Sequence, residues 1–260
     1  MGKRAPLVTA LVAALALSGC SSVSTPQPAP HDTAASPAAP AHSPPTAVPA
    51  KGNTVTRTGS FSALTADSTA GVLAALSAGA PRLELFPLAG GRPRTITLPG
   101  VAGSLSMAKA GDELVLSVPS RHAVLSVNPR TGARRSTAID GAPSDAIRYR
   151  GALIVCVPAK HAVEVYSGVR LVRTITGKLT PTQVVNAGGH LVVLDRNQSA
   201  VFDLDAGTLP AGAKGASADK GSFGNGQRSG NGAANAVADS YGRVLTTDVA
   251  DGALLAFKPA

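Results

Sequence analysis

Five times along this chain, an apolar segment is followed by a polar turn and then by a segment of alternating apolar and polar residues. The apolar segments begin at Val72, Leu114, Leu153, Leu191 and Val244, which are 42, 39, 38 and 53 residues apart. A period near 40 residues with four short strands per unit is typical of β-propeller blades. The sequence therefore predicts an all-β fold, a β-propeller of about five four-stranded blades.

The unit over residues 144–177 is the most regular of the five. Its predicted strands are Asp145–Tyr149, Ala152–Val157, Ala162–Tyr166 and Leu171–Thr176. Glycine or proline stands in the gaps, and Val, Ile and Thr, which favour pleated strands, fill the segments between them. The last unit offers only three strands, Ala234–Ala238, Arg243–Asp248 and Ala253–Phe257. A parallel solenoid is the competing architecture, but it would need shorter coils and no antiparallel hairpins.

A Gly-rich insertion over residues 206–232 accounts for the longest gap between units. Within it, Gly224–Gly230 only loosely resembles a phosphate-cradling loop, because the strand before it and the helix after it are missing. We expect this stretch to be a mobile loop, although loops at a propeller face often carry binding functions. The predicted propeller domain covers residues 57–260.

The N-terminus carries a targeting pattern. Lys3 and Arg4 precede a short apolar run, Ala5–Leu17, which is the order of a signal peptide. The sequence Leu17-Ser18-Gly19-Cys20 resembles the lipobox of bacterial lipoproteins. The resemblance implies a signal peptide over residues 1–19 and a lipidated Cys20 that anchors the mature protein on the extracytoplasmic side of the cell membrane. The alternative is an ordinary secretory leader in which Cys20 is incidental.

Residues 20–56 are predicted to form a disordered tether. Eight prolines stand among Ala, Ser and Thr in Ser21–Thr56, so this segment cannot bury enough apolar surface to fold alone. Serine and threonine next to proline also make O-glycosylation of the tether a possibility. With Cys20 lipidated, Cys156 is the one remaining cysteine, and its apolar neighbours predict a buried, inert thiol.

The hairpins resemble YVTN-type (quinoprotein-like) propeller repeats, and Asp239–Phe257 matches that pattern best. The resemblance spans residues 60–258 and extends to propeller lipoproteins of actinobacterial type, which share the Ala- and Arg-rich composition. Propellers of this family usually have seven blades. Either Thr54–Arg57 supplies the missing outer strand of a closed five-bladed ring, or the chain is a truncated seven-bladed relative.

Four residues are candidates for a site on the rim of the propeller. His122 and His161 occupy the same turn position in adjacent units, and two such histidines could share a metal or a proton. Asp195 and Asp248 end the second strands of the last two units, where a carboxylate either caps a turn or faces the channel. No catalytic or metal constellation can be assembled from them, and the sequence implies no cofactor.

Charge is unevenly distributed. Arg82–Lys178 holds 14 Lys/Arg and six Asp/Glu, a net charge of +8, whereas the residues from Leu179 onward carry −1. This half either faces an anionic lipid or polymer or simply keeps the sheets soluble. Nucleic acid is not expected, because aromatic and basic residues do not interleave.

The function predicted from the sequence is a non-catalytic binding or interaction module of the cell envelope. Its partner would be an envelope protein, a wall polymer or a small ligand. The alternatives are a metal-dependent, lactonase-like propeller hydrolase or an inactive truncated propeller. A quinoprotein enzyme is disfavoured, because its cofactor docks on tryptophans and this chain has none.

Overall fold

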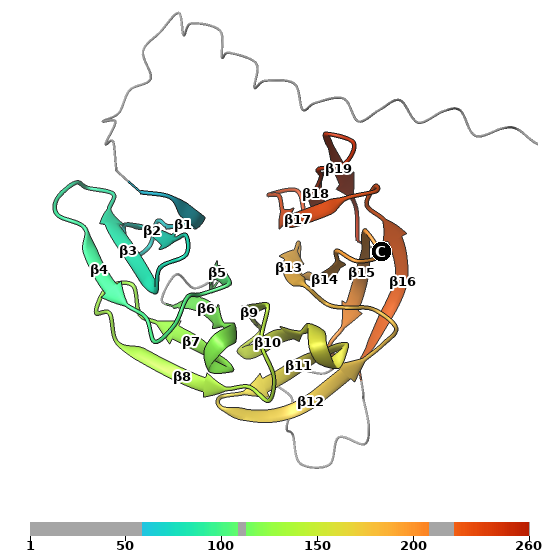
Figure 1. Ribbon diagram of the computed structural model, residues 1–260, viewed down its shortest axis with the longest axis horizontal. Coiled ribbons are helices and arrows are strands. Elements are labelled where there is room, and N and C mark those ends of the chain that lie inside the picture. Colours follow the sequence, from blue (N-terminus) through green and yellow to red (C-terminus); the bar gives the residue numbers. More distant parts are fainter. Residues whose placement is uncertain (1–58, 109–112, 208–220, 260) are drawn as a thin grey trace, which may run out of the picture. The chain divides into compact units, whose positions relative to one another are not determined.

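The structure is a computed structural model that describes residues 59–108, 113–207 and 221–259. Five antiparallel sheets, here called blades 1 to 5, follow one another around a common axis, as in a β-propeller (Figure 1). The predicted signal peptide, Cys20, the tether and Thr54–Arg57 lie outside the described residues. Among the residues that are described, no helix is both long enough and apolar enough to cross a membrane.

The blades are built from consecutive strands. Blade 1 contains β1 (Phe61–Asp67), β2 (Val72–Ser77), β3 (Arg82–Pro87) and β4 (Arg94–Thr97); blade 2 contains β5 (Ser104–Met107), β6 (Leu114–Val118), β7 (Ala123–Val127) and β8 (Arg134–Ala138). Blade 3 contains β9 (Asp145–Tyr149), β10 (Ala152–Val157), β11 (Ala162–Ser167) and β12 (Arg170–Thr176); blade 4 contains β13 (Gln183–Ala187), β14 (His190–Asp195), β15 (Ala200–Asp205) and β16 (Ser222–Arg228). Blade 5 contains β17 (Ala233–Ala238), β18 (Val244–Asp248) and β19 (Ala253–Phe257).

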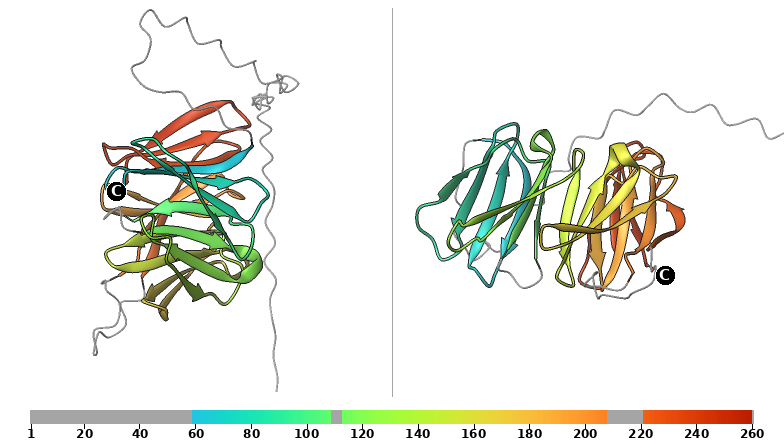
Figure 2. Two further views of the ribbon diagram at one scale, coloured as in Figure 1. Left: turned by 90° about the vertical axis from the view of Figure 1, so that its left-hand side faces the viewer. Right: turned by 90° about the horizontal axis from the view of Figure 1, so that it is seen from below.

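Strand order fixes two rims. In each blade the strands run antiparallel from the innermost to the outermost, as Figures 1 and 2 show. Turns between the second and third strands, and connections to the next blade, therefore lie on one rim, called rim 1. Turns between the first and second strands, and between the third and fourth, lie on the opposite rim, called rim 2.

Four apolar clusters fill the four junctions between neighbouring blades. Leu76 and Leu116 belong to the cluster between blades 1 and 2, and Val115 and Leu153 to the cluster between blades 2 and 3. Two further clusters join blade 3 to blade 4 and blade 4 to blade 5. Consecutive residues of a middle strand point to opposite faces, so both neighbours of a blade are packed through the same strand.

The blade assignment predicted from the sequence is confirmed. The four predicted strands of blade 3 match β9 to β12 to within one residue at each end. The three strands predicted for the last unit match β17 to β19 equally well, and blade 5 has three strands among the described residues. Burial of Cys156, which is fully inaccessible, is also confirmed.

The loop expected within the Gly-rich insertion is partly wrong, because Ser222–Arg228 form β16, the outermost strand of blade 4. These residues pair with β15, whose edge would otherwise be open. Their glycines follow from packing: a Cβ atom on Gly226 would lie 2.5 Å from the ring of Phe202. Glycine here makes room for an aromatic ring on the neighbouring strand, a role that composition alone cannot distinguish from flexibility.

Side chains also tie the innermost strands of neighbouring blades together. Ser106 Oγ donates to the carbonyl of Ala146 (2.8 Å), and Asp145 Oδ2 accepts from the N–H of Val184 (2.9 Å). Gln183 holds both backbone groups of Ala236, donating to its oxygen (2.8 Å) and accepting from its nitrogen (2.9 Å). Neighbouring blades from 2 to 5 are thus linked by polar contacts between their innermost strands, in addition to the apolar clusters.

Candidate functional site

His122 and His161 lie at equivalent positions on rim 1, as their repeat suggested. Each follows a single 3-10 turn, Pro119–Arg121 or Pro158–Lys160, and each has a φ of 50°. Ser199 of blade 4, with a φ of 47°, and Gly252 of blade 5, with a φ of 62°, occupy the same place. The shared requirement is a left-handed backbone, which histidine adopts more readily than most residues.

The contacts of His161 are local. Its Nδ1 lies 3.1 Å from the carbonyl oxygen of Leu179 and 3.3 Å from Thr180 Oγ1. Within residues 59–108, 113–207 and 221–259, no group of three or more His, Cys, Asp or Glu is placed to hold a metal ion.

Asp195 and Asp248 cap turns of rim 1. Asp195 Oδ1 accepts from the N–H of Asn197 (2.8 Å), and its Oδ2 accepts from the N–H of Thr180 (2.7 Å). Asp248 Oδ2 accepts from the N–H of Asn231 (2.8 Å), and this hydrogen bond is the main cause of its lowered pKa. Each carboxylate therefore accepts from backbone N–H groups of two segments: the turn that follows the aspartate, and the connection that leads into its blade.

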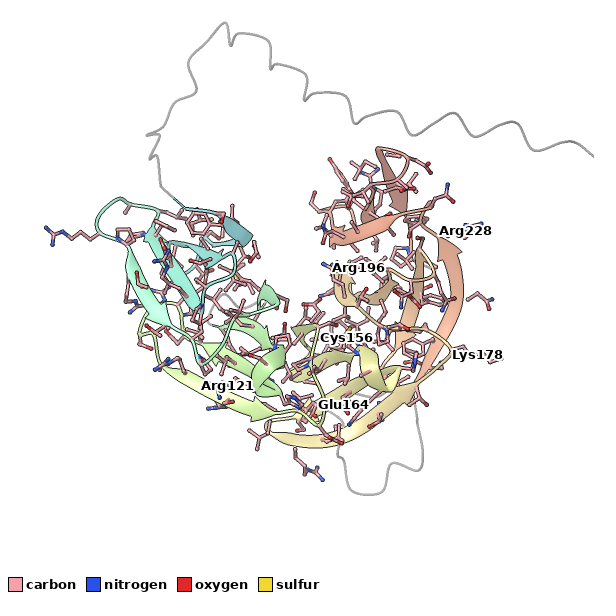
Figure 3. All side chains as sticks on the ribbon, in the orientation of Figure 1. Arg121, Cys156, Glu164, Lys178, Arg196 and Arg228 are labelled. Atoms are coloured by element: carbon pink, nitrogen blue, oxygen red, sulfur yellow. The ribbon has the colours of Figure 1, made fainter. Side chains whose placement is uncertain are left out.

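Blade 3 buries two side chains of reactive or ionisable type, Cys156 and Glu164, which Figure 3 labels. Burial, and then the negative charge of Asp145, raise the pKa of the Cys156 thiol, so it stays protonated and unreactive. Glu164 is buried beside Lys160, whose Nζ donates to its Oε1 (3.1 Å), and Tyr166, whose hydroxyl donates to its Oε2 (2.6 Å). Burial and then this hydrogen bond raise the pKa of Tyr166. These contacts satisfy a buried carboxylate and leave it no free acceptor face toward solvent.

A cleft opens on rim 2, opposite the predicted candidates. Its volume is ≈ 1220 Å³, and it spans the turns of blades 2, 3 and 4. The lining residues are Ala108, Glu113, Ser126, Asn128, Ala133, Arg134, Arg135, Arg148, Tyr149, Arg150, Gly151, Gly168, Asn186, Gly188 and Gly189. Pockets for drug-sized ligands usually measure about 300–1,000 Å³ and are mostly apolar. This cleft is larger, and its lining includes five charged and two amide side chains.

Arg148 is fixed on one wall of the cleft. Its Nε donates to Glu113 Oε2 (2.7 Å), and its Nη2 donates to Glu113 Oε1 (3.3 Å) and to Ser126 Oγ (3.4 Å). Burial alone would raise the pKa of Glu113, but the hydrogen bonds from Arg148 and Ser126, with the charges of Arg148 and Arg135, lower it. The carboxylate is therefore ionised, and the guanidinium fork is held in one orientation.

Tyr149 and Arg150 form the adjoining wall. The Tyr149 hydroxyl donates to the carbonyl of Gly189, so this side chain bridges blades 3 and 4. The guanidinium of Arg150 lies 5.1 Å from the centre of the Tyr149 ring, within reach of a cation–π interaction. Arg150 has a φ of 48° and shares a two-residue turn with Gly151, as type I′ hairpins require. The aromatic ring thus holds a second guanidinium at the edge of the cleft.

Sequence reasoning missed this cleft. Its charged residues are separated by up to 37 positions, from Glu113 to Arg150, and meet only because rim 2 gathers turns from three blades. One signal was available: Arg134-Arg135 and Arg148-Tyr149-Arg150 each stand at a strand end on that rim. The excess of positive charge in Arg82–Lys178 is thus partly concentrated at one place.

Sequence comparison identifies no relatives: no protein-family model matches the chain, and no curated protein matches it. Solved structures do resemble it. A streptogramin B lyase structure aligns with a TM-score of 0.57 at 10% identity, covering 76% of this chain and 68% of the lyase chain. A chain of the mitotic checkpoint complex aligns with a TM-score of 0.58 at 9% identity, covering 73% of this chain and 59% of that one.

The β-propeller domain of Cps50 (Swd1) from Myceliophteria thermophila aligns with a TM-score of 0.54 at 10% identity, covering 73% of this chain and 66% of that domain. This chain therefore spans about two-thirds or less of each of these structures. At such identities the likeness carries no information about ligand or reaction. What it shows is the fold: the described residues form a β-propeller.

Proposed function

We propose that this protein is a lipid-anchored, extracytoplasmic β-propeller of YVTN type that acts as a non-catalytic binding module of the cell envelope. The observation that carries the proposal is the rim 2 cleft of ≈ 1220 Å³, built from the turns of three blades. Turns presented by a rigid scaffold are the usual carriers of binding in such folds. Arginine, asparagine, serine and tyrosine in the lining are side chains that hold ligands by hydrogen bonds and charge.

The hydrolase alternative finds less support in the geometry. Asp195 and Asp248, the carboxylates that a lactonase-like mechanism would need, are engaged by backbone N–H groups on rim 1. The cleft lies on rim 2, so these carboxylates do not line it. The binding proposal needs no further group, because its polar side chains already face the cleft.

Site-specific photo-crosslinking tests the proposal. A photoreactive amino acid at Ala133, which lines the cleft, should crosslink a discrete envelope component in intact cells. The matched control is Ala159, an exposed alanine in the rim 1 turn of blade 3. Equal labelling from both positions, or none from Ala133, would refute a binding function for the cleft.

The membrane anchor makes a separate prediction. Replacing Cys20 with serine should move the protein from the membrane fraction to the soluble fraction and abolish incorporation of a clickable fatty acid. Two or more acyl chains give stable anchoring, and their removal leaves no comparable membrane affinity. The control is Ser21→Ala, which leaves the thiol in place and should stay membrane-bound. Unchanged fatty-acid labelling of Cys20→Ser would show that the lipobox interpretation is wrong.

A further inference from the structure

The rim 2 cleft has a marked charge imbalance. Among the residues that the structure describes, four arginines line it, Arg134, Arg135, Arg148 and Arg150, against one carboxylate, Glu113. Arg134 donates through Nη1 to the carbonyl of Thr97 on blade 1 (2.6 Å), a contact that leaves its charge unneutralised. Only Arg148 forms an ion pair among the described residues of this lining. The described lining of the cleft therefore carries a net positive charge.

The ion pair between Arg148 and the side chain of Glu113 shows which chemical groups the cleft can recognise. Arg148 holds both of its oxygens, which is the two-pronged geometry by which guanidinium groups bind carboxylate and phosphate. The side chain of Arg148 is only 14% exposed, so its orientation is fixed before any ligand arrives. Arg135, whose charge also lowers the pKa of Glu113, extends the same positive surface toward solvent.

The positive groups follow the cleft rather than meeting at one point. Arg134 and Arg135 begin β8 of blade 2, whereas Arg150 stands at the turn of blade 3, beside blade 4. Asn186 on blade 4 also lines the cleft, and its Oδ1 accepts from the N–H of Gly189 (3.0 Å). A small anion would use one of these places and leave the others empty. A chain of regularly spaced anionic groups would use several at once.

We infer that the rim 2 cleft binds an extended polyanion, a linear chain bearing phosphate or carboxylate groups, with Arg135 and Arg150 contacting successive anionic groups. The inference rests on the proposed binding function of the cleft and specifies its ligand class. Arg148 is held in one orientation by its hydrogen bonds to Glu113 and Ser126. Glu113 competes with the ligand for positive charge and so tunes the affinity.

Direct binding measurements test this inference on the full chain in detergent. The probes are linear polyphosphate, poly-L-glutamate, orthophosphate and a neutral dextran, compared by calorimetry at two salt concentrations. Polyphosphate, poly-L-glutamate or both should bind more tightly per anionic group than orthophosphate, and their affinity should fall as salt rises. Dextran should not bind. If neither polymer binds more tightly per anionic group than orthophosphate, the extended ligand is overturned.

Substitutions with opposite expected signs make the test independent of folding. Arg135→Gln and Arg150→Asn should each weaken binding of the preferred polyanion by about tenfold, as expected for a lost charge-assisted hydrogen bond. Asparagine suits the left-handed backbone at position 150. Glu113→Gln should strengthen binding several-fold, because it removes the competing negative charge. A merely destabilised variant would not gain affinity.

The matched control is Arg121→Gln, which removes an exposed arginine from rim 1 and should change affinity by less than about twofold. If Arg121→Gln weakens binding as much as Arg135→Gln, the charge effect is not local and the inference fails. If the photoreactive residue at position 133 crosslinks a ligand, and neither Arg135→Gln nor Arg150→Asn reduces the crosslinking, the proposed binding function is supported but the inferred polyanionic ligand is refuted. If Ala133 crosslinks nothing, the proposed function itself fails.

Discussion

Replacing Leu153 with alanine and, separately, Ile154 with alanine is expected to lower the free energy of unfolding by about 3 kcal/mol in each case. Both side chains are fully buried, although they are neighbours on β10 and point to opposite faces of blade 3. Leu153 belongs to the cluster shared with blade 2 and Ile154 to the cluster shared with blade 4. Each substitution therefore leaves a cavity at a different junction.

Urea unfolding of the two variants gives the comparison directly. Leu64→Ala in β1 is the matched control, because Leu64 is 62% exposed and its truncation should change stability by no more than about 0.5 kcal/mol. In an ordinary sheet with one solvated face, one member of a consecutive pair would resemble Leu64. A small effect at either Leu153 or Ile154 would contradict the packing of blade 3 against a neighbour on that face.

Protein stability is expected to fall between about pH 4 and pH 6.5 because of Asp145. Burial is the main cause that raises the pKa of this carboxyl to about 6, against an ordinary value of 3.8, although hydrogen bonds from Val184 and Ala146 oppose it. In this window the folded protein holds a proton on Asp145 that the unfolded chain has released. Raising the pH therefore favours unfolding, by on the order of 3 kcal/mol once the group is ionised in both states.

Asp145→Asn isolates this contribution. The variant should be less stable than wild type at pH 4, and the gap should narrow by on the order of 2–3 kcal/mol as the pH rises to 7. Asp140→Asn is the control: Lys160 lowers the pKa of Asp140 through a hydrogen bond, so its contribution changes below about pH 4 and the gap stays level above it. A gap for Asp145→Asn that widens with pH would show that the carboxylate is stabilised rather than strained by its site.

Much of the fold was predictable because the repeat is local. Blade 3 could be divided into strands from Gly151, Pro158 and Gly168, which stand in its gaps, and from the β-branched residues between them. β16 could not be predicted, because Gly226 is in a strand for the sake of Phe202 on β15, and Gly224 lies against Asp203 of the same strand. A strand whose composition is set by its neighbour's volume has no signature of its own.

The candidate site was harder to predict, for a related reason. Histidines repeated at His122 and His161 looked like paired ligands, but the repeat also expresses a demand of the backbone, a positive φ after a 3-10 turn. The residues of the cleft form no repeating pattern in the sequence, because Glu113, Arg135 and Arg148 come from turns that differ from blade to blade. Likewise Glu164, in an alternating strand, is buried because Lys160 and Tyr166 reach it.

The side-chain ties between innermost strands have a consequence for how such a chain avoids misassembly. They contact equivalent backbone positions, at Ala146, Val184 and Ala236, each paired with the third residue from the end of the neighbouring second strand. Yet the three contacting side chains are different: a serine that donates, a carboxylate that accepts, and an amide that does both.

Similar blades in one chain can stack in the wrong order or exchange with another copy, a recurrent hazard of repeat proteins. Here a misplaced blade would still bury its apolar faces, but its innermost strand would meet the wrong polar partner. A serine placed where an amide is needed leaves a buried backbone group without a hydrogen bond, which costs about 1–3 kcal/mol. The polar contacts at the junctions can thus all form in only one order of the blades. The differences between the repeats therefore specify which blade lies next to which, while their similarity specifies the fold of each blade.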